Sequence, residues 1–64
     1  MDDFATPSEI ANALQRDMGI EAAIGYAARK AQTTDPGFAA GYSGALAILR
    51  RRSTVGRMLR AAYH

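Results

Sequence analysis

The chain has 64 residues, no cysteine, one histidine and a formal net charge of +2. These counts exclude a disulfide-stapled scaffold and a zinc module, because one needs cysteine pairs and the other four ligands. Fourteen residues are alanine, so few bulky side chains remain for a core, and an enzyme with a deep pocket is not expected. We predict one domain over residues 1–64, without enzymatic activity, cofactor or metal.

The first predicted helix spans residues 7–18. Thr6 and Glu9 have the spacing of a capping box, and Pro7 occupies the first helical position, where no N–H is needed. Gly19 is typical of a residue that ends a helix. Apolar residues then recur every fourth position on the predicted inner face: Ile10, Leu14 and Met18.

The second predicted helix spans residues 20–32 and has an inner face made mostly of alanine. Its apolar stripe is Ile20, Ala23, Ile24, Ala27, Ala28 and Ala31. Alanine lets a neighbouring helix approach closely but contributes little transfer free energy. Thr34 or Asp35 is the expected N-cap of the next helix, with Pro36 at its first position.

The third predicted helix covers residues 36–51 and is apolar or small on every face up to residue 49. Such a helix is normally enclosed by others, so we expect it to be the hub of the fold. Ser53 is a plausible N-cap for a fourth helix over residues 53–62, whose inner face would hold Val55, Met58 and Leu59. Alternatively, the third helix continues unbroken through Arg52. The fold class is therefore all-α, a small bundle of three to four short helices.

A stripe of small residues along the third helix predicts contact with a partner helix or a second copy. The stripe consists of Gly37, Gly41 and Ala45, and the predicted interface also includes Ile48.

Charge is divided unevenly between the two halves of the chain. Residues 1–35 hold all six acidic residues and three basic ones, a net charge of −3. Residues 36–64 hold five arginines and no acid, a net charge of +5. An acidic N-terminal half and an arginine-rich C-terminal segment predict an anionic partner for that segment: nucleic acid, an acidic protein surface or a membrane surface. Alternatively, the arginines cap helix carbonyls or pair with acids of the same chain.

Residues 52–60 resemble the recognition helix of helix-turn-helix DNA-binding domains, and Ala45 lies where that family keeps a small residue. The resemblance implies roles by position. Arg52, Ser53 and Thr54 would face base edges, Arg57 and Arg60 would contact phosphates, and Val55 and Leu59 would pack in the core. Arg50 and Arg51 would add phosphate contacts.

No catalytic motif is convincing. Residues 41–45 approach the G-x-S-x-G elbow of α/β-hydrolases, but no sheet is predicted and no acid follows Ser43. His64 stands at the chain end, where we expect no ordered site. The acidic start, Met1 to Phe4, lacks the basic region of a secretory signal, so we expect a cytoplasmic protein.

Two functions follow from these observations. The first is a small non-enzymatic binding protein that engages an anionic macromolecule, with nucleic acid favoured, through the arginine-rich segment. The alternative is a protein-binding regulator or subunit that uses the apolar helix over residues 36–49, either with a different partner or as a homodimer. A membrane partner is disfavoured because the apolar residues of the C-terminal segment are expected to be needed for the core.

Overall fold

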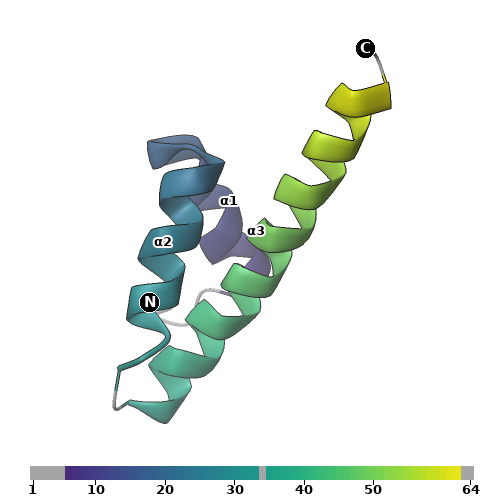
Figure 1. Cartoon of the computed structure of the whole chain (residues 1–64). Coiled ribbons are helices and arrows are strands. Elements are labelled where there is room, and N and C mark those ends of the chain that lie inside the picture. Colours follow the sequence, from purple (N-terminus) through teal and green to yellow (C-terminus); the bar gives the residue numbers. More distant parts are fainter. Residues whose placement is uncertain (1–5, 34, 63–64) are drawn as a thin grey trace.

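Three helices make up the fold in the computed structural model, which describes residues 6–33 and 35–62. They are α1 (Pro7–Met18), α2 (Ile20–Lys30) and α3 (Pro36–Ala62). Each helix packs against both of the others, and α3 extends beyond the turn that joins α1 to α2 (Figure 1). The predicted all-α bundle is confirmed, with three helices rather than four.

The start and end of α1 follow the sequence signals closely. The Thr6 backbone N–H donates to Glu9 Oε1 over 3.0 Å, and the Glu9 N–H donates to Thr6 Oγ1 over 3.2 Å, which completes the capping box. Gly19 ends the helix with φ 85° and ψ 161°. Only glycine adopts this backbone region readily, because a side chain there is strained. The sharp turn from α1 into α2 therefore requires glycine at this position.

The connection from α2 to α3 is also set by a local cap. Helix α2 ends at Lys30, two residues before its predicted end. Asp35 Oδ1 accepts the N–H groups of Gly37 and Phe38 over 3.1 and 3.3 Å, so the carboxylate satisfies two donors at the start of α3. Of the two predicted N-caps, Asp35 serves this role, whereas Thr34 lies outside the described residues.

Helix α3 runs without a break from residue 36 to residue 62, so the predicted boundary at residues 52–53 is wrong. Ser53 does not cap a new helix, because its hydroxyl donates to Glu21 on α2 instead. The Thr54 hydroxyl donates to the Arg50 carbonyl one turn earlier, a contact that threonine makes inside helices. No glycine or proline interrupts residues 45–55, and the helix simply continues.

The core is small and consists mostly of alanine. Its fully buried residues are Ala11, Ala23, Ala27, Ala45 and Leu49. Leu49 is the one large side chain among them, and half-buried isoleucines and leucines surround this cluster. The predicted inner face of α2 is confirmed at Ala23 and Ala27, and that of α1 at Ile10 and Leu14, which pack partly buried against the core. Met18 was expected on the inner face of the first helix but is 38% exposed.

An aromatic cluster fixes the lower end of the bundle in Figure 1, where α2 ends and α3 begins. The ring centroids of Phe38 and Tyr42 are 4.8 Å apart, and those of Tyr42 and Tyr26 are 6.1 Å apart. Lys30 Nζ lies 5.4 Å from the centroid of the Tyr26 ring, within the range of a cation–π contact.

Helix α1 approaches α3 closely because two glycines of α3 face it. A Cβ atom on Gly44 would lie 2.8 Å from both Cβ and Cγ of Pro7, closer than nonbonded carbon atoms allow. A Cβ atom on Gly41 would lie 3.3 Å from Cδ1 of Ile10. The absence of a side chain at these positions therefore sets the distance between the two helices.

We predict that Gly44→Ala destabilises the protein, because the rigid Pro7 ring must move to admit the new methyl group. Overpacking of this kind costs about 1–3 kcal/mol. Gly56→Ala is the matched control: the same change in the same helix meets no atom within 4 Å. Thermal unfolding should show a lower Tm for Gly44→Ala and a Tm about 4 °C higher for Gly56→Ala, since alanine favours the helix. Equal shifts in both variants would contradict the close contact.

Candidate functional site

The C-terminal part of α3, residues 50–62, is the most distinctive surface of the molecule. We call it the projecting half of α3, because it extends beyond the other two helices (Figure 1). All its charged residues are arginines. Four of these arginines are exposed: Arg50, Arg51, Arg57 and Arg60. These arginines therefore lie on one continuous helix, and most of them are in contact with solvent.

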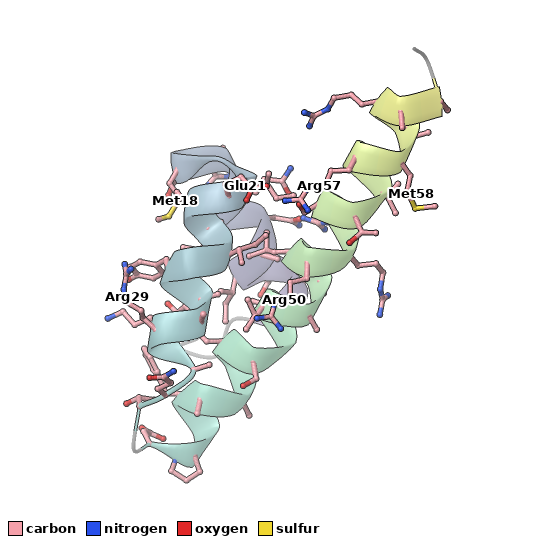
Figure 2. The ribbon with its side chains drawn as sticks, viewed as in Figure 1. Met18, Glu21, Arg29, Arg50, Arg57 and Met58 are labelled. Carbon is pink, nitrogen blue, oxygen red and sulfur yellow. The ribbon has the colours of Figure 1, made fainter. Side chains whose placement is uncertain are left out.

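Polar contacts connect the base of the projecting half to α1 and α2. Arg52 Nη1 donates to Gln15 Oε1 on α1 over 3.0 Å. On α2, Glu21 Oε2 accepts the Ser53 hydroxyl over 3.2 Å and pairs with Arg57 Nη2 at 3.6 Å. Figure 2 shows Glu21 and Arg57 facing each other between the helices. The expectation that acids of the same chain satisfy the arginines therefore applies to Arg57 in particular.

The helix-turn-helix arrangement requires a turn between Ala45 and Arg52, and the unbroken α3 has none. Val55 and Leu59, which this resemblance places in the core, are 49% and 56% exposed. The first polar residues of this segment, which the resemblance assigns to base edges, make contacts within the protein. Arg52 and Ser53 are half-buried and bonded to α1 and α2, while the exposed Thr54 bonds to its own helix.

The predicted partner-helix stripe is mostly used inside the fold. Gly41 faces α1, Ala45 is fully buried, and Ile48 is half-buried against the core. Gly37 alone of the four is exposed. Positions 41 and 45 are thus closed to a partner helix while the chain keeps this fold, because its own α1 covers them.

An exposed apolar ridge lies on the projecting half instead. We define the apolar ridge as Val55, Met58, Leu59 and Ala62. Met58 is 65% exposed and points away from α1 and α2 in Figure 2. The sequence pattern indicated these residues but assigned them to the core. The misassignment arose because the pattern shows which residues share a face and not what covers that face.

A shallow hollow between α1 and α3 was not predicted. It has a volume of about 450 Å³ and is lined by Asn12, Gln15, Arg16 and Arg52. These four residues carry two guanidinium groups and two carboxamides. Arg16 and Arg52 are far apart in the chain, so no local pattern connects them, and only the packing of α1 on α3 brings them together.

Within residues 6–33 and 35–62, no group of histidine, cysteine or acidic side chains has the arrangement of a metal site. None of the three helices is long and apolar enough to cross a bilayer. Residues Tyr63 and His64, at the end of the predicted fourth helix, lie outside the described residues. No protein-family model, curated protein or solved structure matches the chain.

We predict that burial of Leu49, rather than the polar contacts of Glu21, holds the projecting half in place. Leu49→Ala should lower stability by about 2–5 kcal/mol, as expected for a fully buried leucine. Glu21→Gln should change stability by less than about 1 kcal/mol, because Glu21 and Arg57 are 70% and 71% exposed. Urea unfolding followed by circular dichroism compares the two variants. A loss at Glu21→Gln as large as at Leu49→Ala would contradict this ranking.

Proposed function

We propose that this protein binds double-stranded nucleic acid through the projecting half of α3. The observation that supports this most directly is the charge of that segment. Its five arginines lie together without a single acidic residue on the same helix. Arginine forms bidentate hydrogen bonds with phosphate oxygens, and neutralising backbone phosphates releases counterions, which drives nonspecific binding.

The shape of the segment suits a duplex groove. An α-helix with side chains is about 10–12 Å across, and the major groove of B-DNA is about 12 Å wide. Arg51 and Arg60 are nine residues apart, which at about 100° per residue places them on opposite sides of the helix. A helix inserted into the groove would therefore present arginines to both phosphate backbones.

The acidic residues favour one orientation on the duplex. All described acids lie on α1, on α2 or at the N-cap of α3, and none lies beyond residue 35. Phosphates would be repelled by the acidic part and attracted by the projecting half. This division of charge steers the molecule so that the C-terminal part of α3 meets the duplex first.

We expect binding to a 20-base-pair duplex of mixed sequence to weaken steeply with salt. Five phosphate contacts predict a slope of roughly −4.5 in a plot of log affinity against log salt concentration. Arg51→Gln/Arg60→Gln should reduce the slope to about −2.7. Arg29→Gln, at an exposed position on α2, should leave it unchanged. Fluorescence anisotropy between 50 and 200 mM salt measures these slopes, and no binding at 50 mM would refute the proposal.

A second candidate function, self-association, is favoured by the apolar ridge. Its members follow the i, i+3, i+4, i+7 spacing by which helices dock on apolar surfaces. Three of these side chains are about half or more exposed, while the core contains one large buried residue. A second copy that covered the ridge would bury apolar surface that the monomer leaves in water.

Self-association through the ridge predicts a mass and a Tm that rise with protein concentration. Met58→Ser/Leu59→Ser should restore a monomer, whereas Ala61→Ser, an exposed control in the same segment, should not. Salt should strengthen the dimer, because it screens repulsion between two arginine-rich segments, but weaken duplex binding. Sedimentation equilibrium tests this, and a monomer at all concentrations would exclude this second function.

A further inference from the structure

The hollow between α1 and α3 combines groups that suit one kind of ligand. It is lined by two arginines, Arg16 from α1 and Arg52 from α3, and by the carboxamides of Asn12 and Gln15. No acidic residue is part of its lining. Guanidinium and amide N–H groups are hydrogen-bond donors, so a hollow lined by these side chains suits an oxyanion rather than a cation.

Both arginines keep most of their donors for a ligand. A guanidinium group has five N–H donors. Arg52 uses Nη1 on Gln15 Oε1 at 3.0 Å, and this contact orients its side chain beside α1. Arg16 uses Nε on Asp17 Oδ1 at 3.5 Å, a long contact between groups that are 76% and 64% exposed. Among the described residues, neither arginine has a second hydrogen-bond acceptor.

We infer that the hollow binds a phosphate group of the duplex backbone, held between Arg16 and Arg52. This inference rests on the proposed function and specifies where one of the two backbones lies. Arg52 faces α1, and Arg57 faces Glu21 on α2, so the base of the projecting half has an arginine on each side. A groove has a phosphate backbone on each side as well, and the hollow receives the one next to α1.

The inference adds α1 to the binding surface, which neither the charge pattern of the sequence nor the projecting half alone implies. Arg16 becomes a sixth phosphate contact, and the expected salt slope steepens from about −4.5 to about −5.4. Gln15 acts as a positioning residue, because it orients Arg52 and carries no charge. Asp17, next to Arg16, partly opposes the phosphate.

The test measures duplex binding for Arg52→Gln and Arg16→Gln, with Arg29→Gln as the control that removes the same charge from α2. Each of the first two should reduce the slope by about 0.9 and weaken binding about tenfold at 50 mM salt. Arg29→Gln should do neither. Gln15→Ala should weaken binding while the slope stays the same, since no charge is lost. Circular dichroism establishes whether each variant folds. If Arg52→Gln does not fold, Arg16→Gln, at an exposed position, tests the inference by itself.

A second measurement separates this inference from the proposed function. Arginine Nε–H signals of the wild-type protein are followed by NMR during titration with the duplex and with inorganic phosphate. If the duplex binds and does not shift the Arg16 and Arg52 signals, the hollow holds no backbone phosphate, and the proposed function stands. If inorganic phosphate shifts these signals and the duplex does not bind, the proposed function fails and the hollow serves a phosphate group from another source. If neither ligand shifts the Arg16 and Arg52 signals, the hollow does not bind phosphate and the inference is wrong.

Discussion

The close approach of α1 to α3 is the constraint on which the rest of the structure depends. Gly41 and Gly44 present no side chain to α1, and the alanines beside them fill little space. Short helices with such small inner faces have few large side chains to bury, so they gain stability by packing backbones close together. Leu49, the one large buried side chain, lies in the resulting core and anchors the middle of α3.

This way of packing determines how much of α3 is left free. Helices α1 and α2 are 12 and 11 residues long, and α3 has 27. The two short helices cover the first part of α3 and reach the second part through polar side chains at residues 52, 53 and 57. The arginines and the apolar ridge therefore remain largely outside the core, on one continuous helix.

The projecting half of α3 carries both arginines and exposed apolar side chains, which suit different partners. The arginines suit a polyanion, while the ridge of Val55, Met58 and Leu59 suits an apolar partner surface. A membrane partner was disfavoured because these apolar residues were expected to lie in the core. Their exposure removes that reason, and opposite responses to salt distinguish the polyanion from the apolar partner.

Local signals in the sequence determined the cap at Thr6, the turn at Gly19 and the alanine face of α2, and they limited the cap of α3 to Thr34 or Asp35. These features depend on residues within one or two helical turns, and their chemistry is visible in the chain. Only the tertiary structure decided that α3 continues past residue 52, that its last apolar residues are exposed, and that Arg16 meets Arg52 in a hollow. Helical periodicity identifies the residues that share a face, but the lengths and crossing of the neighbouring helices decide whether that face is covered.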